Sequence, residues 1–181
     1  MLQQTEPRPK HMRKFIAPLL VLLTLAACYQ LPTPMAPPPP PALLALQNLP
    51  PGARPDLDPR WYDASGNLHW PPNGGFAAAP VAVVLPSGML LDRFGRPTGN
   101  YFSPQGAPYG ARALPYICQA QVYTVYKVDR PLVVQSGTAA PWFGEPGGAI
   151  QYETGETASQ MLADRTIEPL PDPGPAPCDR K

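Results

Sequence analysis

The chain has 181 residues with a formal net charge of +1 at pH 7, and 30 of its residues are proline. This length allows one modest folded domain, and the balanced charge excludes the basic surface that nucleic-acid binding requires. No Cys/His metal-ligand spacing and no Ser-His-Asp set is present, so the sequence predicts no metal site and no triad hydrolase.

The N-terminus is typical of an export signal. A basic start at residues 12–14 is followed by an apolar run over residues 15–27 and by Cys28, and this run is too short to span a bilayer comfortably. Its Leu-Ala-Ala-Cys ending matches the bacterial lipobox, in which the cysteine thiol receives a diacylglycerol. We predict that residues 1–27 are a lipoprotein signal peptide with its true start at Met12. A plain signal peptide with an incidental cysteine is the alternative.

Lipid on Cys28 would attach the exported chain to the cell envelope, which is the outer membrane in a Gram-negative host. Residues 28–58 follow as a proline-rich tether, with five consecutive prolines at 37–41. Such a segment favours extended polyproline II and forms no packed core. Residues 172–181 are a second proline-rich segment, a tail.

The other two cysteines are Cys118 and Cys178. In an oxidising compartment they can pair, closing a loop of about sixty residues and stabilising the fold by about 3–4 kcal/mol in the chain-entropy model. Two unpaired thiols are the alternative. The proline-rich tail around Cys178 favours the disulfide, because such a tail needs a tie to the domain.

Residues 59–171 are predicted to form one domain of short elements, since glycine and proline recur throughout. Strands are predicted over residues 81–85, 89–93, 119–128, 132–135, 150–153 and 166–170. Pro131 predicts an edge position for the start of the fourth strand. A capping-box pattern from Thr157 to Gln160 predicts one short helix. The fold class is therefore α+β and β-dominated, a small twisted antiparallel sheet with one or two short helices.

Several motifs occur in a fixed order along this domain. They are Trp70 to Phe76, Leu85 to Gly95 with its Leu-Asp-Arg-Phe-Gly run, Thr98 to Pro104, Arg112 to Pro115, Tyr123 with Tyr126, and Ala140 to Gly144 leading to Gln151-Tyr152. Together these blocks resemble the tuberculosis necrotizing toxin (TNT) family of NAD glycohydrolases, which includes fungal surface enzymes. The resemblance covers about residues 68–170, essentially the whole predicted domain.

The resemblance implies hydrolysis of NAD+ to nicotinamide and ADP-ribose, with NAD+ as substrate and no cofactor. It implies catalytic roles for Gln151, Arg93 and Tyr101, and substrate-binding roles for Phe94, Arg112, Trp142 and Thr124. Thr124 stands where the mycobacterial toxin has a functional histidine, so histidine-dependent steps are not expected here. The resemblance also makes a toxin function and an immunity protein as partner natural expectations.

The residue types suit this chemistry. Nicotinamide leaves as a neutral ring, so the barrier is an oxocarbenium-like ribose and catalysis comes mainly from positioning and electrostatics. Arginine forks suit a pyrophosphate, and a glutamine carboxamide suits a ribose hydroxyl or the attacking water. Phe94 and Trp142 are candidates to stack on the nicotinamide ring, although both also fit a hydrophobic core. Glu145 and Glu153 are candidate general bases, with a solvated surface as the default reading.

Two other functions remain open at this point. ADP-ribosyl transfer to a protein would use the same pocket but would need a carboxylate that activates the acceptor. A non-catalytic envelope lipoprotein that keeps the fold as a binding module is the other, and the threonine at position 124 motivates it.

Overall fold

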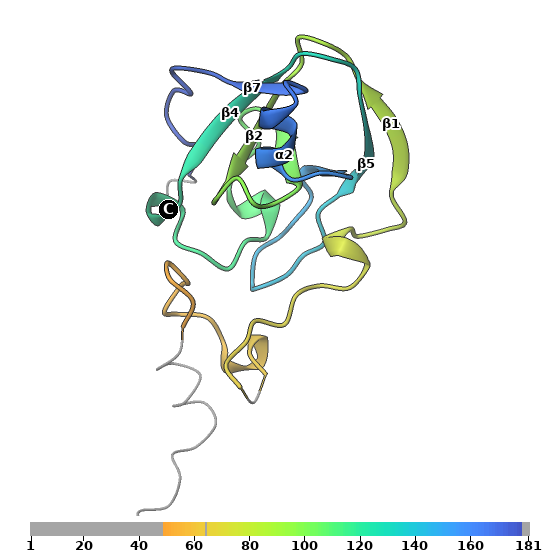
Figure 1. Cartoon of the computed structure of the whole chain (residues 1–181). Helices are drawn as coiled ribbons and strands as arrows, with labels where there is room; N and C mark the ends of the chain where they lie inside the picture. The colour runs from red at the N-terminus through yellow and green to blue at the C-terminus, as the bar shows by residue number, and fades with distance from the viewer. Residues whose placement is uncertain (1–48, 64, 179–181) are drawn as a thin grey trace, which may run out of the picture. The chain divides into compact units, whose positions relative to one another are not determined.

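The computed structural model describes residues 49–63 and 65–178 (Figure 1). Met12, Cys28 and the polyproline run lie outside these residues. Within them the strands are β1 (Val81–Leu85), β2 (Leu90–Phe94), β3 (Tyr101–Pro104), β4 (Tyr123–Val128), β5 (Leu132–Thr138), β6 (Ile150–Thr154) and β7 (Ile167–Pro169). They form a seven-stranded sheet in the order β1-β5-β6-β3-β2-β4-β7.

Every neighbouring pair in this sheet is antiparallel. The one α-helix of the described residues, α2 (Ala158–Ala163), begins with a capping box in which Thr157 and Gln160 bond reciprocally. It packs against the sheet (Figure 1) and closes a core that contains Leu91, Phe102 and Met161. The prediction of a β-dominated α+β fold with an antiparallel sheet is confirmed.

Four short 3-10 helices lie in the loops of the described chain, at Pro59–Trp61, Asn73–Gly75, Gly110–Arg112 and Cys118–Ala120. The last of these corrects the predicted strand over residues 119–128, which begins only at Tyr123. Cys118 begins this 3-10 helix and forms a disulfide with Cys178. The apolar alternation that predicted the strand is real, but it starts four residues later.

The edge position predicted from Pro131 is wrong. Strand β5 is an interior strand between β1 and β6, and β1 is the edge on that side. The proline lies one residue before the strand, whose first paired residue is Leu132, opposite Leu85. Its missing N–H therefore costs the ladder nothing.

The folded part extends beyond residues 59–171 at both ends. Ala53 and Leu57 are buried, and Ala53 pairs with Tyr116 across an isolated bridge. At the other end the Pro177 carbonyl accepts a hydrogen bond of 3.0 Å from the Tyr109 amide. Residues of the segment 49–58, assigned above to the tether, and residues 176–178 of the tail thus pack on the domain.

Candidate active site

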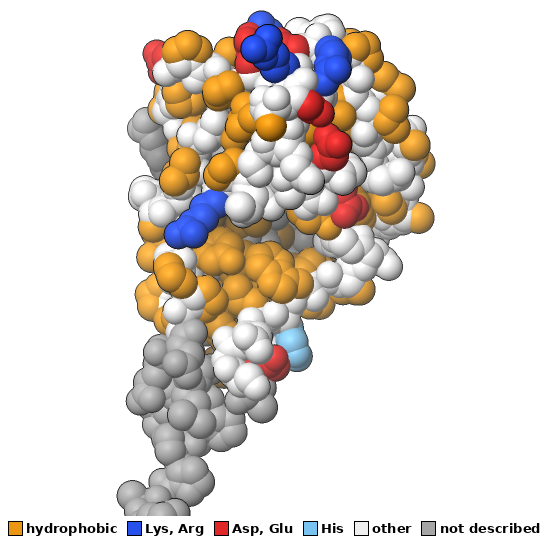
Figure 2. All heavy atoms as spheres, in the orientation of Figure 1, with side chains coloured by type: hydrophobic (Ala, Val, Ile, Leu, Met, Phe, Trp, Pro, Cys, Tyr) orange, Lys and Arg blue, Asp and Glu red, His pale blue; other side chains and the backbone are white. Residues whose placement is uncertain are grey.

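A cavity of about 710 Å³ opens beside the middle of the sheet. This is the size of a site for a ligand as large as a nucleotide. Strands β6, β3 and β2 are neighbours, and each contributes side chains to the wall. Among the lining residues are Arg93, Phe94, Tyr101, Arg112 and Gln151, far apart in sequence but together here. Figure 2 shows a hollow on this face in which hydrophobic side chains gather.

Arg93 lines the cavity and is buried, with only 8% of its surface exposed. Its Nη2 donates to the Arg96 carbonyl at 2.8 Å and its Nη1 to the Tyr101 carbonyl at 3.3 Å. In the described residues its Nε has no hydrogen-bond partner, and no carboxylate lies within ion-pair distance. Burial lowers the pKa of the guanidinium, but an arginine remains charged at neutral pH. The cavity thus holds a positive charge that no anion of the domain compensates.

Gly99 makes room for this guanidinium. A Cβ at position 99 would lie 2.3 Å from Arg93 Nη2, far closer than van der Waals contact permits. Asn100 follows Gly99 in the chain, and its carbonyl accepts from the Thr154 amide at 3.0 Å. The backbone is therefore held near this point, and the guanidinium must yield instead.

For the NAD+ hydrolysis that the resemblance implies, we expect Gly99→Ala to displace Arg93 and to lower kcat/KM by about 100-fold, because a misplacement of about 1 Å costs that much at an active site. Thermal unfolding should change little. Gly155→Ala is the matched control, since nothing lies within 4 Å of its added Cβ. Equal nicotinamide release by the two variants would contradict the supporting role of Gly99.

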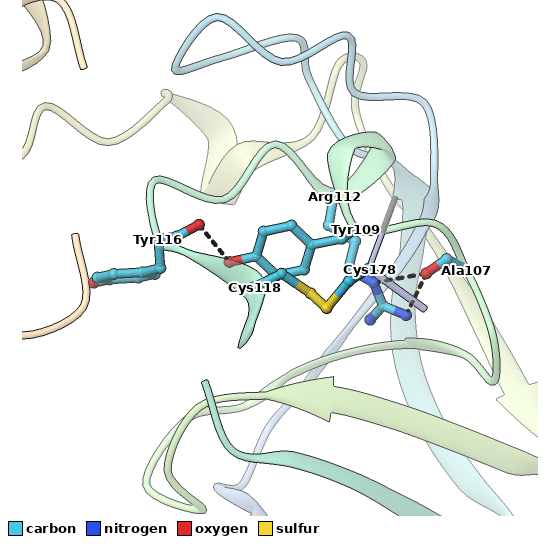
Figure 3. Close-up of a disulfide and its surroundings, with 6 residues drawn as sticks. All are labelled: Ala107, Tyr109, Arg112, Tyr116, Cys118 and Cys178. Carbon is cyan, nitrogen blue, oxygen red and sulfur yellow. Dashed lines mark hydrogen bonds between the residues drawn. A yellow bond between two sulfur atoms is a disulfide. The ribbon is translucent and has the colours of Figure 1, made fainter. Parts of the chain in front are cut away.

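Arg112 also lines the cavity, but its charge is compensated. Its Nη2 lies 2.6 Å from Oδ1 of Asp92, a side chain with 0% exposure. Its Nε and Nη2 both donate to the Ala107 carbonyl, at 3.0 and 2.8 Å (Figure 3). The guanidinium carbon lies 5.0 Å from the centre of the Phe94 ring. Arg112 therefore fixes the Phe94 wall in addition to lining the cavity.

Phe94 is held from behind by other aromatic rings and by the disulfide. Its ring meets that of Tyr109 edge-on at 4.7 Å and that of Tyr123 at 4.9 Å. The disulfide between Cys118 and Cys178 belongs to the same cluster, with its Cα atoms 5.8 Å apart. Figure 3 shows this bridge beside Tyr109, with Arg112 nearby. The structure thus contains the predicted disulfide and places it behind one wall of the cavity.

Gln151 and Tyr101 form the opposite, polar side. Gln151 Nε2 donates to the Gly74 carbonyl at 2.9 Å, and the Tyr101 hydroxyl donates to Glu153 Oε1 at 2.9 Å. Burial, together with the hydrogen bond to Glu153, raises the pKa of Tyr101 to about 12. The phenol is therefore neutral at physiological pH and keeps its proton on the side of Glu153.

Two of the expected substrate-binding residues do not line the cavity. Trp142 packs against Trp61 at 5.1 Å and donates its Nε1 to the His69 carbonyl at 2.6 Å. Thr124 pairs with Arg93 across the β2–β4 ladder, but its side chain is not part of the cavity wall.

The indole at the cavity belongs to Trp70, which is 54% exposed and lies 6.4 Å from the ring of Tyr116. Arg96, Pro50 and Pro51 line the cavity as well. Sequence reasoning missed these residues as site residues. Trp70 opens the first motif block, so a signal for it was present. The two prolines lie in the segment assigned to the tether.

Within residues 49–63 and 65–178, no group of three or more His, Cys, Asp or Glu side chains is placed to hold a metal ion. The cavity wall of this part of the chain also includes no histidine and no carboxylate. Its side-chain charges come from arginine, and its remaining polar groups are hydroxyls and carboxamides, such as those of Thr98, Tyr101 and Gln151. The arrangement suits an anionic ligand with flat aromatic parts.

Comparison with known proteins agrees with the family resemblance of the motifs. The model of the family described as tuberculosis necrotizing toxin matches residues 84–170. The conidial surface nicotinamide adenine dinucleotide glycohydrolase nadA of Aspergillus fumigatus is 35% identical over 119 residues, which cover 59% of this chain and 51% of that protein. The chain thus spans about half the length of this curated relative.

A solved structure shares the fold. The tuberculosis necrotizing toxin, complexed with its immunity factor IFT, matches with a TM-score of 0.50 and 21% identity, over 71% of this chain and 86% of that one. The family match, the relative and the fold confirm the resemblance inferred from the ordered motifs. Residues 84–170 are thus the part of this chain that matches the tuberculosis necrotizing toxin family.

Proposed function

We propose that this protein is an NAD+ glycohydrolase, which cleaves NAD+ with water to nicotinamide and ADP-ribose. The observation that carries this proposal is the cavity itself. It joins an uncompensated arginine, an aromatic wall and a carboxamide from three neighbouring strands in a volume of about 710 Å³. The glycohydrolase activity in the name of the Aspergillus relative supports the same reaction.

Each lining group has a role in this proposal. Arg93 binds the pyrophosphate, because its charge has no carboxylate partner among the described residues. Phe94, backed by Arg112 and Tyr109, offers a flat hydrophobic face to a ring. Gln151 holds a ribose hydroxyl or the attacking water through its carboxamide. Nicotinamide needs no proton to leave, so the reaction can proceed although position 124 is a threonine and not a histidine.

The test is nicotinamide release from NAD+ by the purified, folded protein, measured by chromatography. We expect Gln151→Ala to lower kcat about 100-fold, which is the usual cost of removing one positioned donor from an active site. The matched control is Gln105→Ala, an exposed glutamine that does not line the cavity. A folded wild type that releases no nicotinamide, or a Gln151→Ala variant as active as the control, would overturn the assignment.

The place of action is a separate part of the proposal. No helix in the described part of the chain is long and apolar enough to cross a membrane. We propose that the chain is exported and held at the envelope by lipid on Cys28, as its lipobox indicates. The surface location in the name of the Aspergillus relative agrees with export. Incorporation of labelled fatty acid into wild type but not into Cys28→Ala tests the anchor.

An immunity protein is the partner that we propose besides NAD+. The tuberculosis necrotizing toxin was solved in complex with its immunity factor, and an enzyme that consumes NAD+ endangers the cell that makes it. A protein encoded beside this one that binds the purified domain and stops nicotinamide release would support the proposal. Unchanged release in the presence of bound protein would count against it.

A further inference from the structure

If the proposed hydrolysis is correct, one proton must be moved. Nicotinamide leaves as a neutral ring, so the leaving group needs none, and the proton in question is the one that water loses as it bonds to the ribose. The described residues that line the cavity include no aspartate, glutamate or histidine. A protein group that accepts this proton would therefore lie behind a lining residue and act through it.

Two carboxylates lie directly behind the cavity wall. Asp92 lies behind Arg112 and is fully buried. Its Oδ1 is paired with the Arg112 guanidinium, and its Oδ2 accepts from the Gly106 amide at 2.8 Å and from the Tyr123 hydroxyl at 2.9 Å. The carboxylate thus has three partners in the wall, and the one that lines the cavity is a cation.

Glu153 lies behind Tyr101 and is differently placed. Tyr101 and Glu153 are direct cross-strand partners of β3 and β6, and the Tyr101 hydroxyl donates to Glu153 Oε1 at 2.9 Å. Among the described residues no cation lies within ion-pair distance of this carboxylate. Its side chain is partly exposed, so a proton received there can pass on to solvent.

The surroundings favour a relay at this pair. Gly74 lies against both groups, since a Cβ there would be 3.1 Å from the Tyr101 hydroxyl and 3.4 Å from Glu153 Oε2. Gln151, two residues before Glu153 on β6, donates to the Gly74 carbonyl and lines the cavity. Because the phenol gives its own proton to Glu153, its oxygen is free to accept one from the cavity side.

We propose that Glu153, acting through Tyr101, accepts the proton of the attacking water. The water oxygen bonds to the ribosyl C1′ as the C1′–N bond breaks and its electron pair passes to the nicotinamide nitrogen. One water proton moves to the Tyr101 oxygen while the phenol proton moves to Glu153. Glu153 then releases the proton to solvent, and the tyrosine is unchanged at the end of the turnover.

The first test is Glu153→Gln, which keeps an oxygen to accept from Tyr101 but removes the proton-accepting charge. We expect kcat for nicotinamide release to fall about 100-fold or more, the usual contribution of a general base. The Kd for ADP-ribose, measured by calorimetry, should stay within about threefold of wild type, because the arginines are untouched. Glu168→Gln is the matched control, a glutamate of β7 in an exposed pair with Lys127.

Azide supplies a readout that a merely structural role would not move. Azide is an anionic nucleophile with no proton to lose, so it bypasses the proposed acceptor. We expect azide to restore nicotinamide release by Glu153→Gln and by Tyr101→Phe, with ADP-ribosyl azide as product. Wild type and Glu168→Gln should gain little from it.

The outcomes separate the two proposals. A folded wild type that releases no nicotinamide overturns both the hydrolase and the relay. An active wild type with Glu153→Gln equally active overturns the relay alone. A slow Glu153→Gln that azide does not rescue, or that loses ADP-ribose binding as well, also overturns it, because the residue would then only support the wall.

Discussion

Replacing Arg93 by methionine is expected to lower kcat/KM for NAD+ about 1,000-fold while changing the free energy of unfolding by only about 1 kcal/mol. The loss of activity follows because this guanidinium is a buried charge of the cavity that no carboxylate of the described residues pairs with. The small effect on stability follows because relief from burying an unpaired cation offsets its two hydrogen bonds to the Arg96 and Tyr101 carbonyls. ADP-ribose binding should weaken in parallel.

Two further variants sharpen this prediction. Arg93→Lys keeps the charge but not the planar fork, and we expect it to recover only a small part of the activity. Arg130→Met removes an exposed arginine that contacts Asp164 and should leave turnover unchanged. An Arg93→Met protein that unfolds at much lower temperature, or that binds ADP-ribose as wild type does, would show that the guanidinium has mainly a structural role.

Removing the disulfide has the largest expected effect on stability. We expect the double variant Cys118→Ala/Cys178→Ala to be less stable by about 3–4 kcal/mol, because the bridge closes a long loop and so lowers the conformational entropy of the unfolded chain. Its sequence separation of 60 residues spans β4, β5, β6, α2 and β7. The melting temperature should fall by roughly 10–20 °C, as circular dichroism or calorimetry would measure.

The same variant should affect activity in a particular way. The bridge packs in the cluster behind Phe94, so activity should be lost at temperatures well below those that inactivate the wild type. Treating wild type with a dithiol reductant should reproduce the double variant, and the double variant itself should not respond to it. A stability change below about 1 kcal/mol would contradict the account, since the bridge would then constrain little.

Local patterns predicted the elements well where a short stretch of chain decides the outcome. The capping box at Thr157 fixes the start of α2, and the apolar run over residues 81–85 is β1 with the predicted bounds. The burial expected from that apolar run is wrong, because β1 is an edge strand that leaves Val81 and Val84 exposed. Strand order was beyond such reasoning, because β3 pairs with β2 and with β6, whose residues lie some fifty positions further on. Nothing local in either strand encodes that partnership.

The site shows the same limit in its tryptophans. Trp70 and Trp142 are both aromatic residues inside motif blocks, and the sequence favoured Trp142. The structure instead packs Trp142 with Trp61 and leaves Trp70 at the cavity. Which of two similar rings faces a ligand depends on how separate loops meet, and that is a tertiary property.

The two arginines of the cavity wall show the same limit of sequence reasoning. Arg93 and Arg112 looked equivalent as pyrophosphate ligands, yet only Arg112 has a carboxylate partner. Asp92 precedes Arg93 directly on β2, so the two side chains leave the strand on opposite faces. Asp92 therefore does not neutralise Arg93, its neighbour in sequence, and pairs with the distant Arg112 instead.

Pro50 and Pro51 lie upstream of every strand and still form part of the cavity wall. Their rings fix the backbone without any hydrogen-bonded ladder, so this stretch of wall is stiff although it belongs to no sheet. A fragment that starts at residue 59 would retain all the strands and the disulfide but would lack part of the cavity wall. The unit that encloses the cavity therefore begins earlier in the chain than the β-sheet does, and cleavage after Pro51 would detach part of this wall while leaving every strand covalently intact.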